Sequence, residues 1–287
     1  MKFFADTANI VEIEYCFSKK VNDGITTNPK IMEMTGNLTE GFEGASRLIL
    51  NKFKETPISL ETDLANLDAR NLKKIDPEKV KTVLLSQAYS LSSLGKDVVV
   101  KIPICEGGIL ATKKLFEEGI KTNVTACMTP YQAIVAANAG ATYVSLFANR
   151  MLDSRIIEIS GNSLEEITKN PNWKDIVKKN KEKYFEKAWE KVLGDISYVS
   201  SYLEGGKTEL IVGSIRTPED IYRISKAEPQ IITIPTKIVE KLEDINKIKG
   251  TKRTIKPSIF KDEGSLYHPM TQYTIEEFEE SAKNYKK

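Results

Sequence analysis

The chain has 287 residues, of which 40% are hydrophobic and 29% charged, so it can build a sizeable core and is not a disordered chain. Its 42 basic and 40 acidic residues give a formal net charge of +2, and this near balance argues against a protein that binds nucleic acid through its phosphates. The single histidine, His268, argues against His-rich metal catalysis, and no glycine-rich phosphate-binding motif follows a strand, so we expect neither a metal nor a cofactor.

Eight short apolar segments recur along the chain, and most of them lead into polar residues. The segments cover residues 2–5, 24–25, 58–60, 98–100, 122–124, 143–144, 210–213 and 231–234. Their length and their β-branched residues predict buried strands. The polar residues at or just beyond their ends include Asp6, Thr27, Asn28, Glu61, Lys101, Thr125, Ser145, Arg150, Ser214 and Arg216.

Segments with helical signals separate these strands. Apolar spacing together with start and stop signals predicts helices over residues 9–20, 37–53, 77–94, 108–118 and 129–139, and Thr217-Pro218 opens another. Strands that alternate with helices in this way are parallel, and the helices lie outside them. Eight such units in a chain of this length predict an α/β fold of the closed (β/α)8 class, the TIM barrel, rather than an open sheet.

Two segments fall outside the regular alternation. The connection over residues 154–205 is unusually long, and its second half has the apolar spacing of the sixth barrel helix. We therefore expect a barrel over residues 1–250 with a helical insertion or lid over residues 154–180. Residues 251–287 are expected to form a C-terminal arm and helix that docks on a neighbouring subunit, which predicts a homo-oligomer.

The polar residues at the strand ends have two interpretations. Active residues of (β/α)8 barrels sit at the carboxyl ends of the strands. Ser, Thr, Asp and Asn at these positions also cap the helix or form the turn that follows. Capping explains Lys101, Glu61 and Arg150 poorly, so the pattern favours an active site at this end of the barrel.

Lys101 follows directly on Val98, Val99 and Val100. Lysine is rarely buried without a partner, and desolvation favours the neutral amine, which is a nucleophile. The alternative is a lysine that bends out of the strand to reach solvent. We interpret Lys101 as a Schiff-base residue that attacks the carbonyl of a ketose, because the neighbouring strand ends supply the other groups that this chemistry needs.

These other groups fall into three sets. Glu61 and Thr125 are expected to hold a water for proton transfer, and Asp6 to accept the proton of a substrate hydroxyl. Asn28 is expected to hold sugar hydroxyls. The residues expected to bind a phosphate are Arg150, Ser214 and Arg216.

Several motifs of the chain resemble those of the transaldolase family. They are Asp6-Thr7-Ala8-Asn9, Gly24-Ile25-Thr26-Thr27-Asn28-Pro29, Val100-Lys101-Ile102-Pro103, Gly119-Ile120-Lys121-Thr122-Asn123-Val124-Thr125, Ala139-Gly140-Ala141-Thr142-Tyr143-Val144-Ser145 and the closing His268-Pro269-Met270-Thr271. The small-subunit branch, which also contains the fructose-6-phosphate aldolases, is the most similar. The resemblance covers almost the whole chain except roughly the first half of residues 154–205.

The resemblance implies a (β/α)8 fold and the transfer of a dihydroxyacetone unit through a lysine Schiff base. The donor would be sedoheptulose 7-phosphate or fructose 6-phosphate, and the acceptor an aldose phosphate. It assigns the same catalytic roles to Lys101, Asp6, Glu61 and Thr125. It also places Thr27, Asn28 and Ser145 in the substrate site and Arg150, Ser214 and Arg216 on the phosphate.

Two positions bear on the choice between a transferase and a lyase. The aldolases of the family have Gln where this chain has Glu61 and Tyr where it has Phe147. A tyrosine hydroxyl would orient a water and help to protonate the enamine, whereas Phe147 leaves the enamine for an acceptor aldehyde. Both positions favour a transaldolase. A fructose-6-phosphate aldolase and a non-catalytic barrel that binds phosphorylated sugars remain the alternatives.

Cysteine usage and the N-terminal residues bear on location. Cys16, Cys105 and Cys127 suit neither a disulfide framework nor a zinc site. The first residues contain no long apolar segment, and no segment approaches the length of a membrane span. We expect a cytoplasmic protein with no nucleic-acid or membrane partner. The family resemblance implies in addition an enzyme of the pentose phosphate pathway that acts on phosphorylated sugars.

Overall fold

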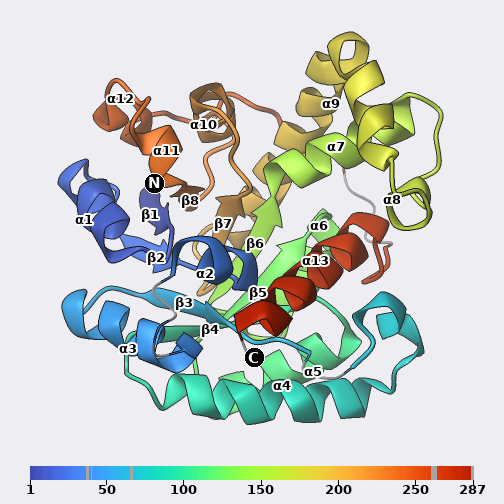
Figure 1. Ribbon diagram of the computed structural model, residues 1–287. Coiled ribbons are helices and arrows are strands. Elements are labelled where there is room, and N and C mark those ends of the chain that lie inside the picture. Colours follow the sequence, from blue (N-terminus) through green and yellow to red (C-terminus); the bar gives the residue numbers. More distant parts are fainter. Residues whose placement is uncertain (37–38, 40, 65–66, 260–263, 286–287) are drawn as a thin grey trace.

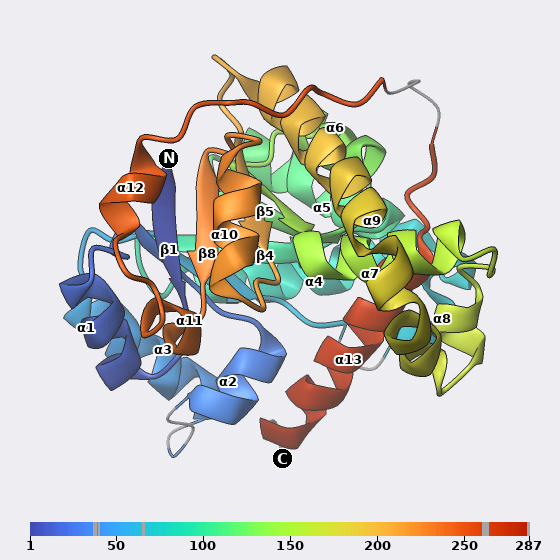
Figure 2. The same cartoon turned by 90° about the horizontal axis from the view of Figure 1, so that it is seen from above.

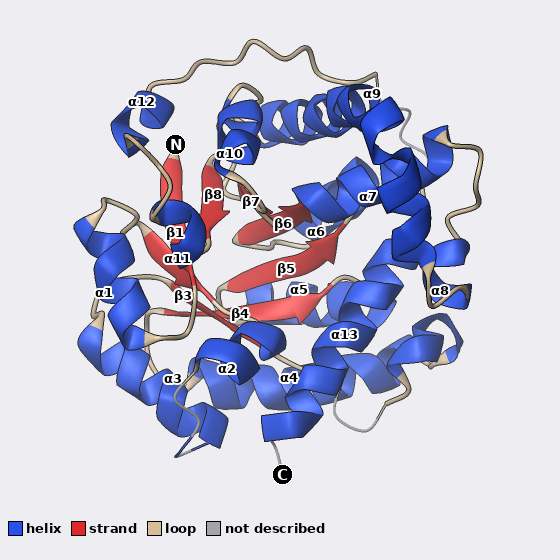
Figure 3. Ribbon diagram, turned by 45° about the horizontal axis from the view of Figure 1, so that its top comes forward, coloured by secondary structure: helices blue, strands red, loops and turns tan. Residues whose placement is uncertain are grey.

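The structure, a computed structural model, describes residues 1–36, 39, 41–64, 67–259 and 264–285. Its parallel strands close into a barrel in chain order, with helices around the outside (Figure 1, Figure 3). The strands are β1 (Lys2–Asp6), β2 (Gly24–Thr26), β3 (Ile58–Glu61), β4 (Val98–Pro103), β5 (Thr122–Cys127), β6 (Tyr143–Phe147), β7 (Glu209–Gly213) and β8 (Ile231–Ile234). The predicted (β/α)8 fold is confirmed.

The barrel interior has an apolar layer that supports a polar one. Phe4, Val99, Tyr143, Ile211 and Ile231 form a buried cluster, in which the Phe4 and Tyr143 rings meet edge to face at 5.8 Å. Gly24 faces the same layer, because a Cβ there would lie 2.5 Å from the Phe4 ring. Since side chains alternate along a strand, the residue two positions further on faces the interior again.

That next position carries a polar side chain on most strands. The interior-facing polar residues are Asp6 on β1, Thr26 on β2, Lys101 on β4, Ser145 on β6 and Thr233 on β8. The alternation of side chains therefore places a layer of polar residues at the carboxyl end of the barrel. Packed apolar side chains close the barrel below this layer.

The helices follow the predicted pattern. They are α1 (Ile10–Ser18), α2 (Pro29–Thr35), α3 (Gly41–Lys52), η2 (Ala69–Lys74), α4 (Pro77–Ser92), α5 (Glu106–Glu117), α6 (Pro130–Asn138), α7 (Ala148–Ile159), α8 (Glu166–Lys169), α9 (Trp173–Leu203), α10 (Pro218–Ser225), α11 (Thr236–Val239), α12 (Ile245–Lys249) and α13 (Pro269–Tyr285). The expected start of the helix over 37–53 lies at residues outside the described ones. None of the described helices combines the length and the apolar character that crossing a membrane requires.

The long connection between β6 and β7 is helical throughout most of its length. Residues 154–180 contain the end of α7, the short α8 and the first turns of α9. The expected insertion and the expected sixth barrel helix share α9, which runs for 31 residues without a break. Pro171 lies just before the start of this helix, so it does not interrupt it.

The C-terminal arm wraps around its own barrel. It runs from α12 across α9, where the Ser258 N–H donates to the Gly194 carbonyl at 3.0 Å, and continues to α13 (Figure 2). Helix α13 packs against α2, η2 and α8 of the same chain. At its start, Thr271 Oγ1 donates to the Ala126 carbonyl at the end of β5. The tail that was expected to dock on a neighbouring subunit thus has a site on its own chain.

His268 precedes α13 and makes folding of the arm sensitive to pH. Its Nδ1 accepts a hydrogen bond from the Met270 N–H at 3.1 Å. Burial, together with the charge of Arg155, lowers the pKa of His268 from 6.5 to about 4. The unfolded chain therefore takes up a proton between these pH values that the folded chain does not, so the free energy of unfolding falls as the pH falls through this window.

The variant His268→Asn keeps a side-chain acceptor but has no titrating imidazole. We expect the wild type to lose up to about 3 kcal/mol more stability than this variant between pH 7 and pH 4. Urea unfolding of both proteins at the two pH values measures the difference, and the carboxylates that titrate in both proteins cancel. Equal losses in the two proteins would show that His268 is not held neutral.

Candidate active site

A cavity of about 270 Å³ opens at the carboxyl end of the barrel, above the polar layer. Most of the predicted site residues line it: Asp6, Asn28, Lys101, Ser145, Phe147, Arg150 and Ser214. Arg216 lines an adjoining cleft, whereas Glu61, Thr27 and Thr125 are buried in the barrel wall. The fold thus brings to one end of the barrel side chains that are separated by more than 200 residues.

Lys101 is buried at the base of this cavity. Its Nζ lies 2.8 Å from Glu61 Oε2, and it donates a hydrogen bond of 2.8 Å to the Thr27 carbonyl. Glu61 and Lys101 face each other because they are register partners on β3 and β4. The side chain of Lys101 is only 5% exposed, so the alternative in which it reaches solvent is wrong.

Burial shifts the pKa values of two carboxyl groups at the site, Glu61 and Asp6, in the same direction. Burial raises the pKa of Glu61 above its usual value, although the positive charge of Lys101 opposes this effect. Burial also raises the pKa of Asp6, against a hydrogen bond of 2.8 Å from Thr26 Oγ1 and the charge of Lys101. Both groups therefore hold a proton at higher pH than an exposed carboxyl does, which suits groups that exchange protons during a reaction.

Asn123 is a site residue that the sequence analysis missed. It lies next to Lys101 in the β4–β5 register and lines the cavity. Ser145 Oγ donates to its Oδ1 at 2.7 Å, and its Nδ2 donates to Ser59 Oγ at 3.2 Å. These bonds fix the amide and the Ser145 hydroxyl beside the amine. Residues 122–124 were interpreted as an apolar strand, but the polar spacing of Asn123 and Thr125 was a signal for an interior face.

Of the predicted residues Thr27, Asn28 and Thr125, the first two have hydrogen-bond partners within the fold. Thr27 Oγ1 donates to the Ser59 carbonyl, and it is the Thr27 backbone that touches the Lys101 amine. Asn28 Oδ1 caps α2 by accepting from the Ile31 N–H at 2.8 Å, so the capping interpretation holds for this residue while it also lines the cavity. Thr125 Oγ1 is buried and has no hydrogen-bond partner among the described residues.

Ser214 and two arginines lie at the outer side of the cavity. Arg150, on α7, and Ser214 line both this cavity and the adjoining cleft, in which Arg216 lies. Ser214 has a φ of +63°, a left-handed conformation that costs a non-glycine residue about 1 kcal/mol. Arg216 is held by Asp153, with Nη–Oδ distances of 2.9 and 2.6 Å. The predicted phosphate-binding residues are thus neighbours.

Helix α13 completes the site with residues that no pattern in the sequence indicated. Glu277 pairs with Arg150 at 2.5 Å and with Lys30, on α2, at 2.7 Å. Phe278 lines the cavity and packs its ring 6.3 Å from that of Phe147. The C-terminal helix therefore forms one wall of the barrel mouth.

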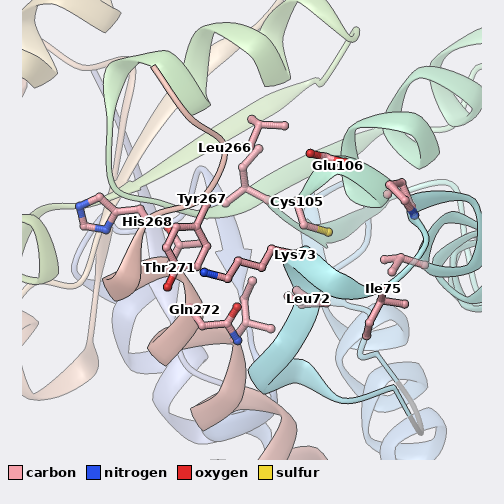
Figure 4. Close-up of a pocket in the computed structure, with 15 residues that line it drawn as sticks. Leu72, Lys73, Ile75, Cys105, Glu106, Leu266, Tyr267, His268, Thr271 and Gln272 are labelled. Atoms are coloured by element: carbon pink, nitrogen blue, oxygen red, sulfur yellow. The ribbon is translucent and has the colours of Figure 1, made fainter. Parts of the chain in front are cut away.

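A separate pocket lies outside the mouth, between η2, the start of α5 and the start of α13 (Figure 4). Lys73 lies there over the Tyr267 ring, 4.4 Å from its centroid. Burial raises the pKa of Cys105 to about 11, so its thiol stays protonated at neutral pH and is a poor nucleophile. None of the predicted site residues lines this pocket.

A closed parallel barrel with a charged cavity at the carboxyl ends of its strands is the architecture of a (β/α)8-barrel enzyme. Among the described residues, no three side chains of the metal-binding types cluster.

The comparisons with known proteins give the family. A family model described as transaldolase/fructose-6-phosphate aldolase matches residues 3–287. A protein of Syntrophobacter fumaroxidans named "probable transaldolase" is 35% identical over 244 residues, which cover 84% of this chain and 89% of that protein. Proteins of Aquifex aeolicus and Clostridium botulinum with the same name are each 34% identical over 242 residues; the matches cover 84% and 83% of this chain and 88% and 87% of those proteins. The chain belongs to the transaldolase/fructose-6-phosphate aldolase family.

Proposed function

We propose that this enzyme transfers a dihydroxyacetone unit from a ketose phosphate to an aldose phosphate through a Schiff base on Lys101. The observation that carries the proposal is the buried Lys101–Glu61 pair at 2.8 Å, whose lysine lines the same cavity as Asp6 and Arg150. The names of the relatives agree with this activity.

The first step uses Lys101 and Glu61. The pKa of Glu61 is raised by burial, so this carboxylate can take a proton from the adjacent ammonium and leave a neutral amine. The amine adds to the C2 carbonyl of the ketose and gives a carbinolamine, which loses water to form the Schiff base. Asn123 and Ser145 lie beside the amine with fixed orientations, which supports a role in binding the hydroxyls next to the carbonyl.

Water addition and loss need a positioned proton carrier. Thr125 Oγ1 is buried and lacks a hydrogen-bond partner among the described residues, and the buried Glu61 Oε2 lies 2.8 Å from the Lys101 amine. Buried polar atoms are nearly always hydrogen-bonded to protein or water. A water bonded to Thr125 and Glu61 would give the Thr125 hydroxyl a partner and would carry protons to and from the carbinolamine.

The second step uses Asp6. Its carboxylate accepts the proton of the C4 hydroxyl while the C3–C4 bond breaks, and the electron pair of that bond passes into the Schiff base. An aldose phosphate leaves, and the three carbons remain on Lys101 as an enamine. The enamine carbon then attacks the aldehyde of the acceptor, Asp6 returns the proton to the new hydroxyl, and hydrolysis frees Lys101. Arg150, Ser214 and Arg216 hold the phosphate of donor and acceptor in turn.

Phe147 distinguishes a transferase from a fructose-6-phosphate aldolase. Its ring is buried against Phe278 and lines the cavity without offering a hydroxyl to an attacking water. We expect the wild type to convert fructose 6-phosphate only when erythrose 4-phosphate is present. Phe147→Tyr supplies the hydroxyl and is expected to raise acceptor-independent release of dihydroxyacetone by about tenfold or more.

A coupled assay of both proteins with and without erythrose 4-phosphate measures these rates. Comparable turnover by the wild type in the two conditions would identify an aldolase. Binding of sugar phosphates without any turnover would instead support the non-catalytic barrel.

The family resemblance also supports a place in the pentose phosphate pathway, a cytoplasmic location and assembly into a homo-oligomer. We propose these properties with the activity.

A further inference from the structure

The cleft beside the barrel mouth has more positive charge than one phosphate needs. It has a volume of about 460 Å³ and adjoins the catalytic cavity through the shared residues Arg150 and Ser214. The cationic side chains that line it are Arg150, Lys174, Lys178, Lys181 and Arg216, and the carboxylates are Asp153 and Glu277. Five cations against two carboxylates leave a surplus of +3, in a chain whose whole net charge is +2.

The surplus of positive charge comes from lysines of helix α9. Arg150 is paired with Glu277 and Arg216 with Asp153. Lys174, Lys178 and Lys181 have no ion pair with a carboxylate in the part of the chain that the structure describes. Their spacing of four and three residues places them on one face of α9.

The first turn of α9 is fixed against the C-terminal helix. In Figure 2 the start of α9 lies beside α13. Trp173 packs edge to face on Tyr273 of α13, with ring centroids 5.3 Å apart, and the Lys174 amine lies 5.7 Å from both ring centroids. The basic face is therefore held at the cleft by packing, and its charges do not depend on a chance orientation of the helix.

A phosphate monoester carries about two negative charges at neutral pH. The inner end of the cleft, with Arg150, Ser214 and Arg216, already offers enough donors for one such group. The three lysines of α9 add positive charge and hydrogen-bond donors for a ligand that carries more than one phosphoryl group.

We propose that the three lysines of α9 form a second anion site, so that the cleft binds a chain of two or more linked phosphoryl groups. The inner phosphoryl group lies at Arg150 and Arg216 and the outer ones lie along α9. Such a ligand occupies the place of the sugar phosphate and inhibits the enzyme competitively. The competition rests on the proposed function, whereas the binding does not.

Calorimetry on the intact protein tests the binding with inorganic tripolyphosphate and orthophosphate as probes. We expect tripolyphosphate to bind the wild type about tenfold more tightly than orthophosphate. The variant K174Q/K178Q/K181Q should reduce this ratio below about threefold. The control K179Q/K183Q/K187Q removes the same charge from exposed positions of α9 that do not line the cleft, and should keep the ratio.

Equal binding of the two probes by the wild type, or an equal loss in both triple variants, would overturn the second site. Circular dichroism confirms that the variants are folded. Inhibition of turnover by tripolyphosphate is measured separately, so an inactive protein that still shows the lysine-dependent binding would contradict the proposed function alone. A nucleoside triphosphate in place of tripolyphosphate shows whether the ligand is recognised through the phosphates only or through a base as well.

Discussion

Replacing Lys101 with Met is expected to reduce dihydroxyacetone transfer by about 10⁴-fold or more, because the thioether cannot form a Schiff base and no other group takes its place. Met has a similar length and fills the same buried volume. Glu61 then loses its cationic partner, but its raised pKa lets it hold a proton and avoid a bare buried charge. Transfer from fructose 6-phosphate to erythrose 4-phosphate measures the rate.

Thermal unfolding and circular dichroism check that Lys101→Met is folded. Lys121→Met is the matched control, since Lys121 is exposed just before β5 and should tolerate the change with wild-type activity. Substantial activity in Lys101→Met would contradict a covalent mechanism. Loss of the folded state instead would show that Lys101 serves the stability of the barrel.

Replacing Asp6 with Asn is expected to reduce transfer by about 10³-fold while the Schiff base still forms, because the amide cannot take up the C4 hydroxyl proton. The hydrogen bond from Thr26 Oγ1 can be kept by the amide oxygen, so the geometry of the cavity should change little. Steady-state transfer measures the loss, and borohydride trapping with fructose 6-phosphate measures the Schiff base. An Asp6→Asn protein that neither turns over nor forms an adduct would place Asp6 in binding or folding rather than in bond cleavage.

The same residue predicts the pH profile. Asp6 must be ionised to accept the proton, and burial raises its pKa. The acid limb of kcat/KM for the wild type should therefore fall at a pH above the usual range of an Asp carboxyl, as the pH decreases through the raised pKa. Glu61 must also be ionised for the first step, and burial raises its pKa too. The residual activity of Asp6→Asn should therefore lose the part of the acid limb that Asp6 sets and keep the part that Glu61 sets.

The barrel could be predicted because the alternation of side chains along a strand repeats every two residues and can be read from a short segment. Side chains alternate along each strand, so an apolar residue two positions before a polar one indicates both the strand and its interior face. Val99 and Lys101 show the pattern most clearly, since one packs in the apolar layer and the other lines the cavity. The parallel register then makes Lys101 and Glu61 neighbours.

The rest of the site depends on long-range packing. Helix α13 has an apolar face that predicts burial, but nothing in its sequence says that Glu277 would meet Arg150 or that Phe278 would meet Phe147. The ion pair between Arg216 and Asp153 likewise joins residues 63 positions apart. These contacts join segments that are far apart in the sequence, so local patterns carry no signal for them.

The proposed mechanism depends most on the covalent role of Lys101. Incubation with fructose 6-phosphate and sodium borohydride, followed by proteolysis and mass spectrometry, shows which residue carries the sugar fragment. We predict one reduced adduct, on the peptide that contains Lys101, and none in Lys101→Met. An adduct on a different lysine, or no adduct at saturating donor, would contradict the mechanism.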